Sequence, residues 1–86
     1  MKVTVIGIGK VGSTVAFMLA REGLASDLVL WNRTYAVAEA EATDIQQACA
    51  FTPFRVQARA AQKVEDTADS DVLVVCASVP TPVDMS

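Results

Sequence analysis

The residues with the clearest chemical meaning are three glycines near the start of the chain. Gly7, Gly9 and Gly12 form a Gly-x-Gly-x-x-Gly pattern between a β-branched run and a segment of helical spacing. In such a pattern the first glycine permits a tight turn, the second lets the backbone approach an anion, and the third lets the helix pack closely on the strand. The free N–H groups at the helix start then face the anion, aided by the helix dipole.

This position after a strand and before a helix is the context that a dinucleotide-binding motif requires. We therefore expect a dinucleotide pyrophosphate to contact the whole loop, which consists of Gly7, Ile8, Gly9, Lys10, Val11 and Gly12. The alternative is a glycine turn kept only for packing. A nucleoside-triphosphate loop is excluded because Ser13 and Thr14 follow the last glycine, where a Lys and a Ser/Thr would be needed.

A second polar cluster lies about 20 residues beyond the last glycine, where NAD sites usually place a carboxylate for the ribose hydroxyls. Here the residues are Asn32, Arg33 and Thr34. Asn32 still offers hydrogen bonds to a ribose but does not repel a 2′-phosphate, and Arg33 could pair with that phosphate. Thr34 adds a backbone N–H at the next helix start. On this reasoning NADP is favoured over NAD. The alternative is that Arg33 is only a solvated charge.

Composition excludes several other kinds of chemistry. The 86 residues contain no histidine, which removes histidine-based triads and histidine acid–base catalysis. Cys49 and Cys76 lack the spacing of paired metal ligands, so we expect no metal site. The net charge of −3 argues against a nucleic-acid partner. No segment approaches the roughly 18 apolar residues of a membrane helix. We therefore expect a cytoplasmic protein with no membrane partner.

The apolar spacing predicts the elements that must position these residues. Strands are expected at residues 3–8, 28–31, 54–58 and 72–76, helices at 11–22 and 35–48, and a short helix or loop at 60–68. This alternation specifies an α/β fold, a Rossmann-like doubly wound parallel sheet of about four strands in the order 3-2-1-4.

That order leaves the apolar strand at residues 72–76 at an edge of the sheet, which proteins normally avoid. We therefore expect residues 1–86 to form the N-terminal part of a dinucleotide-binding domain. We expect further strands or a homo-oligomer to complete it.

Four segments of the chain also carry a resemblance to a known family. They are VTVIGIGKVGSTVAFMLA, GLASDLVLWN, EATDIQQA and DTADSDVLVVCASVP. Together they resemble the N-terminal part of the lactate/malate dehydrogenase family over nearly the whole chain. The resemblance implies a nicotinamide cofactor bound by residues 7–12, by residues 32–34, and by Ala77, Ser78 and Val79. It also implies that the catalytic Asp and His lie beyond Ser86, so we expect no catalytic residue within this chain.

The sequence departs from the family pattern at several positions, of which three bear on function. Asn32 replaces the family acid, Ser78 replaces a glycine, and Thr81 stands where malate-type members have a substrate-binding Arg. The last departure argues against a dicarboxylate substrate. We interpret the chain as the cofactor-binding part of an NAD(P)-dependent oxidoreductase of the 2-hydroxyacid dehydrogenase type. The alternatives are a non-catalytic dinucleotide-sensing module and another NADP-linked reductase family.

Overall fold

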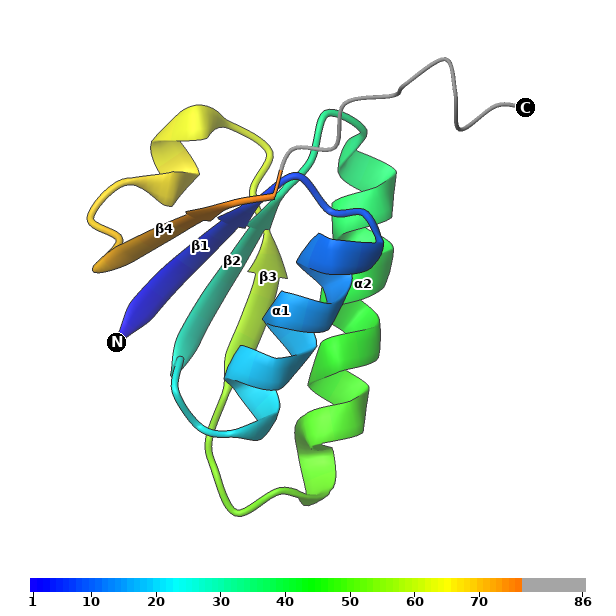
Figure 1. Cartoon of the computed structure of the whole chain (residues 1–86), viewed down its shortest axis with the longest axis vertical. Helices are drawn as coiled ribbons and strands as arrows, with labels where there is room; N and C mark the ends of the chain where they lie inside the picture. The colour runs from blue at the N-terminus through cyan, green and yellow to red at the C-terminus, as the bar shows by residue number, and fades with distance from the viewer. Residues whose placement is uncertain (77–86) are drawn as a thin grey trace.

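The computed structural model describes residues 1–76 and has a parallel sheet with two helices against one face (Figure 1). The elements are β1 (Lys2–Ile6), α1 (Lys10–Arg21), β2 (Asp27–Trp31), α2 (Tyr35–Ala48), the 3-10 helix η1 (Cys49–Phe51), β3 (Gln57–Ala60), the 3-10 helix η2 (Val64–Thr67) and β4 (Val72–Val75). The strand order is β3-β2-β1-β4 and all neighbours are parallel. The predicted Rossmann-like fold and strand order are confirmed.

The core lies between the sheet and the two helices. Val3 of β1 pairs with Leu28 of β2, and Val5 pairs with Leu30. Because side chains alternate along a strand, these four share the helix-covered face. They pack with small residues of α1 and with one stripe of α2, namely Ala16, Ala20, Ala38, Ala42 and Ile45. The alanines let both helices approach the sheet closely.

The second helix begins where the sequence predicts it. Thr34 has extended backbone angles (φ −98°, ψ 111°) and α2 follows directly, although the Thr34 side chain makes no capping hydrogen bond. Ala38, Ala42 and Ile45 are its buried residues, at the spacing of one helical face. Within residues 1–76, neither helix has the length and apolar character needed to cross a membrane.

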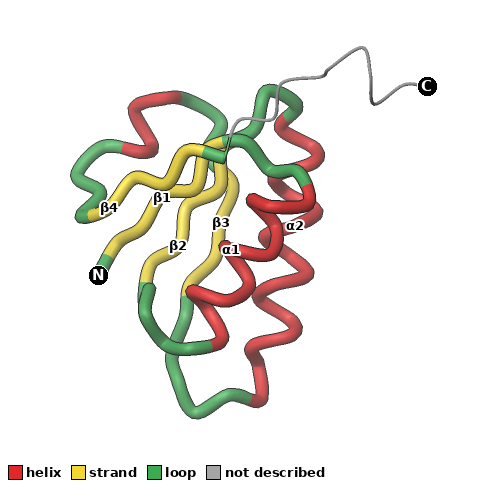
Figure 2. The backbone as a smooth tube through the Cα atoms, in the orientation of Figure 1, coloured by secondary structure: helices red, strands yellow, loops and turns green. Residues whose placement is uncertain are grey.

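The segment that contains η2 lies on the side of the sheet opposite the two helices (Figure 2). The Thr4 and Ser70 hydroxyls are hydrogen-bonded, and the Lys2 ammonium donates to the carbonyl of Ala68 at 2.5 Å. A small apolar hollow of about 110 Å³ remains between Ile6 and Val64. The loop that carries η2 is thus fixed to β1, although η2 is too short to bury a whole sheet face.

Two strands differ from the predicted bounds by more than one residue at an end. β1 ends at Ile6 rather than at residue 8, because Gly7 turns the chain with a φ of 85°. The third strand is Gln57–Ala60 rather than residues 54–58, since pairing with β2 begins only where the Gln57 N–H donates to the Ser26 carbonyl. Strand extent here follows from the pairing partner, which apolar spacing alone does not reveal.

Candidate functional site

The glycine loop connects β1 to α1 at the carboxyl end of the sheet, and two of its glycines have a steric explanation. Gly7 has a φ of 85°, a backbone conformation that residues with a Cβ rarely adopt. A Cβ on Gly12 would lie 2.3 Å from the carbonyl oxygen of Gly7. The first turn of α1 therefore packs against the loop only because residue 12 has no side chain.

The backbone N–H groups of the loop fall into two sets. Those of Gly7 and Ile8 are used inside the protein, since Gly7 donates to the Trp31 carbonyl at 2.9 Å and Ile8 donates to the Asn32 Oδ1 at 3.1 Å. Within residues 1–76, no hydrogen bond uses the N–H groups of residues 9–12. These groups begin α1, where the helix dipole is positive. The loop therefore presents a row of free donors suited to an anion.

The ends of three strands meet beside this row of donors. Gly7 follows β1 and bonds to the last residue of β2, while the Cys76 N–H, just after β4, donates to the Ile6 carbonyl at 2.8 Å. The Cβ of Cys76 lies 3.5 Å from the place that a Cβ on Gly12 would occupy. Open parallel sheets bind ligands outside the carboxyl ends of their strands, which is where these residues lie. The predicted contacts Ala77, Ser78 and Val79 fall outside the described residues.

The three residues after β2 have different surroundings. The Asn32 side chain accepts from Ile8 and its Nδ2 donates to the Thr34 carbonyl at 3.1 Å. Arg33 is exposed, and no hydrogen bond or ion pair holds its guanidinium within the described part of the chain. The structure thus brings Asn32 to the glycine loop, whereas nothing fixes Arg33 for binding a phosphate.

The first residue of α2 has a perturbed phenol. Partial desolvation raises the pKa of Tyr35 above its usual value, and the nearby Glu39 carboxylate raises it further. The Tyr35 hydroxyl donates to Glu39 Oε2 at 3.2 Å. The phenol therefore stays neutral at physiological pH and is directed along α2, away from an acid–base role.

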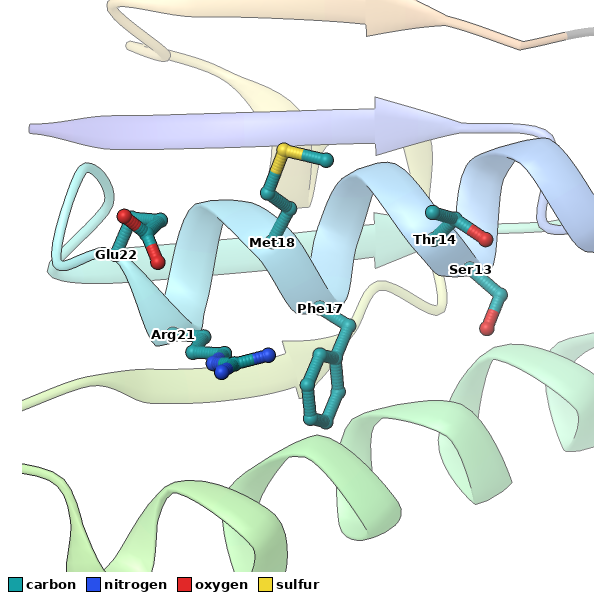
Figure 3. Close-up of a pocket in the computed structure, with 6 residues that line it drawn as sticks. All are labelled: Ser13, Thr14, Phe17, Met18, Arg21 and Glu22. Atoms are coloured by element: carbon teal, nitrogen blue, oxygen red, sulfur yellow. The ribbon is translucent and has the colours of Figure 1, made fainter.

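A larger hollow lies farther along α1. It has a volume of about 380 Å³ and is lined by Ser13, Thr14, Phe17, Met18, Arg21 and Glu22. Figure 3 shows Phe17 and Arg21 on the side of α1 nearest α2. This hollow contains none of the free loop donors, so it is separate from the anion site. Among residues 1–76, no group of three or more His, Cys, Asp or Glu side chains is arranged to hold a metal ion.

Comparison with known proteins agrees with this geometry. The model of the lactate/malate dehydrogenase NAD-binding domain matches residues 1–85. The chain belongs to the lactate/malate dehydrogenase family. Because the match extends over almost the whole sequence, it confirms the resemblance and the interpretation of the chain as the cofactor-binding part of such a protein. It does not support the sensing module or another reductase family.

Individual relatives include both branches of the family. The chain is 33% identical to a malate dehydrogenase of Pelagibacter ubique over 85 residues, covering 99% of the chain and 27% of the relative. It is 43% identical to an L-lactate dehydrogenase of Treponema denticola over 76 residues, 88% of the chain and 24% of the relative. A solved lactate dehydrogenase from a Medee basin deep-sea metagenome library superposes with a TM-score of 0.87 at 32% identity. The superposition covers 93% of this chain and 25% of the solved one. The chain thus spans about a quarter of the length of these relatives.

The preference for NADP predicted from Asn32 and Arg33 is wrong. The family domain that matches this chain is an NAD-binding domain. The role of a phosphate partner was predicted for Arg33 from its charge alone. Within residues 1–76, Arg33 is an exposed side chain whose guanidinium makes no hydrogen bond or ion pair, and Asn32 makes hydrogen bonds to the loop and to Thr34. A surface charge without fixed geometry offers little selective binding.

The sequence did not indicate the division of the loop donors, nor that Cys76 would lie beside the position of a Cβ on Gly12. Only the position of Cys76 at the end of the strand beside β1 could have suggested this proximity. Nothing in the sequence indicated the hydrogen bonds of Asn32, because an asparagine after a strand is compatible with many kinds of turn.

Proposed function

We propose that this chain binds NAD as the cofactor-binding part of an oxidoreductase of the lactate/malate dehydrogenase type. The observation that carries this proposal is the row of N–H groups from Gly9 to Gly12, at the start of α1, that have no hydrogen-bond partner within residues 1–76. A pyrophosphate carries negative charge and accepts several hydrogen bonds. A ligand with these two properties suits a row of N–H donors at the positive end of a helix. The glycine at residue 12 keeps the row open by letting α1 lie against the loop.

The remaining contacts of the proposed site come from the ends of β2 and β4. Asn32 uses one lone pair of Oδ1 and one hydrogen of Nδ2 within the protein. An amide has two of each, so one acceptor and one donor are left for ribose hydroxyls. Ala77, Ser78 and Val79 follow Cys76 directly in the sequence and complete the proposed set of contacts.

The activity that we propose belongs to a longer protein of which this chain forms a part. Bound NAD would supply a hydride acceptor for the oxidation of a secondary alcohol. This chain would bind the cofactor and orient it, and the acid–base group would come from outside residues 1–86. Of the two substrates named among the relatives, the neutral Thr81 favours a 2-hydroxy monocarboxylate over a dicarboxylate. The cytoplasmic location stays a prediction.

We also propose that the β4 edge of the sheet is covered in the assembled protein. Val72, Leu73 and Val75 are 42%, 55% and 62% exposed, although they form a continuous apolar strand. A further strand of the longer protein or a second copy of the chain would cover this edge and remove a template for aggregation. Light scattering of the chain at increasing concentration tests this, since a strictly monomeric chain would contradict it.

Calorimetric titration of the 86-residue chain with NAD⁺ tests the binding proposal. We expect saturable binding of one NAD⁺ per chain and no turnover of lactate or malate by the chain alone. Absence of heat and of any spectral change would contradict it. With the longer protein, NADH oxidation is compared between pyruvate and oxaloacetate, and faster reduction of oxaloacetate would contradict the role given to Thr81.

A further inference from the structure

Asn32 stands at the position of the family acid, yet its contacts are those of an amide. It accepts a hydrogen bond from the Ile8 N–H at 3.1 Å, and it donates one to the Thr34 carbonyl at 3.1 Å. One partner is a donor and the other an acceptor, so only one orientation of the amide satisfies both. A carboxylate in its place could accept from Ile8 but has no hydrogen to donate to Thr34.

These two contacts join segments that are distant in the sequence. Ile8 lies in the glycine loop after β1, whereas Thr34 is the residue before α2. Ile8 is itself 6% exposed, so its N–H would lack a compensating partner if Asn32 were removed. The Gly7 N–H donates to the Trp31 carbonyl and so forms a second link between the glycine loop and the end of β2. These two residues directly precede Ile8 and Asn32 in the sequence.

We propose that Asn32 is a positioning residue for the glycine loop, fixing the turn from which the free donors of residues 9–12 project. Asn32 accepts a hydrogen bond from the Ile8 N–H, which therefore serves the structure of the loop. The N–H groups of residues 9–12 are left for a ligand. The second hydrogen bond of Asn32, to Thr34, holds the amide plane in place. This role differs from recognition of a ribose, because it acts on the loop in the absence of any cofactor. Its effect on ligand binding rests on the function proposed above.

A matched control is present in the same chain. Gln46 of α2 also makes one bond of each kind to the main chain, because its Nε2 donates to the Val56 carbonyl at 2.9 Å and its Oε1 accepts from the Ala58 N–H at 2.8 Å. It connects α2 to β3 and, within residues 1–76, makes no hydrogen bond to the glycine loop. Gln46→Ala therefore removes an equivalent pair of bonds at a different place.

The first readout is amide hydrogen exchange of Ile8, which needs no ligand. We expect Asn32→Ala to accelerate Ile8 exchange about tenfold relative to the exchange set by global unfolding. Gln46→Ala should leave that ratio unchanged. Asn32→Asp should give intermediate exchange, because it keeps the acceptor and loses the donor. Unchanged Ile8 exchange in Asn32→Ala, or slower exchange in Asn32→Asp than in the original chain, would overturn the proposal.

The second readout is binding of inorganic pyrophosphate, followed by the shifts of the amide signals of residues 9–12. This probe has no ribose, so it separates loop positioning from ribose recognition. We expect Asn32→Ala to weaken pyrophosphate binding about three- to tenfold and Gln46→Ala to leave it unchanged. Equal weakening by both variants, or no weakening by Asn32→Ala, would overturn the proposal. If the original chain bound neither pyrophosphate nor NAD⁺, the proposed function would fail, and Ile8 exchange alone would decide the role of Asn32.

Discussion

Strands β2 and β4 flank the same central strand and have similar apolar sequences, but their surroundings differ. Leu28, Val29 and Leu30 of β2 are fully buried, whereas Leu73 of β4 is 55% exposed. β2 has a paired strand on each side and lies under the helices, while within residues 1–76 β4 pairs with β1 alone. Burial is therefore decided by the neighbours that the topology provides and not by the hydrophobicity of the strand itself.

The difference also separates two tasks. The β1–β2 side, with α1 and α2, builds a complete core and holds the glycine loop through Gly7, Ile8 and Asn32. The β4 side contributes the Cys76 backbone to the loop and otherwise presents an apolar edge. We therefore expect substitutions on the β1–β2 side to change the stability of the fold and the binding of NAD⁺. Substitutions on the β4 side should change the self-association of the chain.

The largest effect is expected in β2. Leu28→Ala removes a fully buried side chain from between the sheet and the helices. Such a change costs about 2–5 kcal/mol, which is enough to unfold much of a small domain. Urea denaturation followed by the fluorescence of Trp31 measures it. A loss below about 1 kcal/mol would mean that this core is not packed as the structure indicates.

A smaller but still large effect is expected at Gly12. Its replacement by Ala places a Cβ 2.3 Å from the Gly7 carbonyl oxygen, so the loop and α1 must move apart. We expect a loss of about 1–3 kcal/mol in unfolding free energy, together with loss of NAD⁺ binding.

Gly9→Ala is the matched control for Gly12, because a Cβ on Gly9 would meet nothing within 4 Å and its backbone is extended. We expect its unfolding free energy to stay within about 0.5 kcal/mol of the original while NAD⁺ binding weakens. Thermal unfolding and calorimetry of both variants provide the comparison. Equal stability of the two variants would contradict the close approach at Gly12.

Substitution in β4 should have a modest effect on folding. Leu73→Lys alters a half-exposed side chain, so we expect a change of about 1 kcal/mol or less in unfolding free energy. The charge should instead reduce self-association of the chain, which sedimentation velocity measures. A strong loss of stability without any change in association would contradict this expectation, because it would show that the Leu73 side chain is already buried in the folded chain.

The smallest effect is expected at the surface ion pair between β2 and β3. The Arg59 Nε lies 3.4 Å from Asp27 Oδ1, with both side chains partly exposed. Arg59→Ala should cost about 0–1 kcal/mol, and the cost should fall with added salt. Urea denaturation of both proteins at low and high salt measures the loss of unfolding free energy. A loss that does not depend on salt would contradict this prediction.

Much of this organisation could be predicted from the sequence. The alternation of apolar runs and helical spacing gave the elements, and the glycine motif located the loop, because both depend on local spacing. The extent of β3 and the exposure of β4 depend on which strands become neighbours. The contacts of Asn32, and the lack of a partner for Arg33 among residues 1–76, depend on side-chain geometry. That is why cofactor preference, inferred from charge at those two residues, was predicted wrongly.

The most direct test of the central claim is an amide NMR spectrum of the chain during titration with NAD⁺. We expect the largest shifts at Gly9, Lys10, Val11 and Gly12, whose N–H groups have no hydrogen-bond partner within residues 1–76, and a smaller shift at Ile8. A spectrum that does not change, or shifts centred on the α1 hollow around Met18, would contradict it.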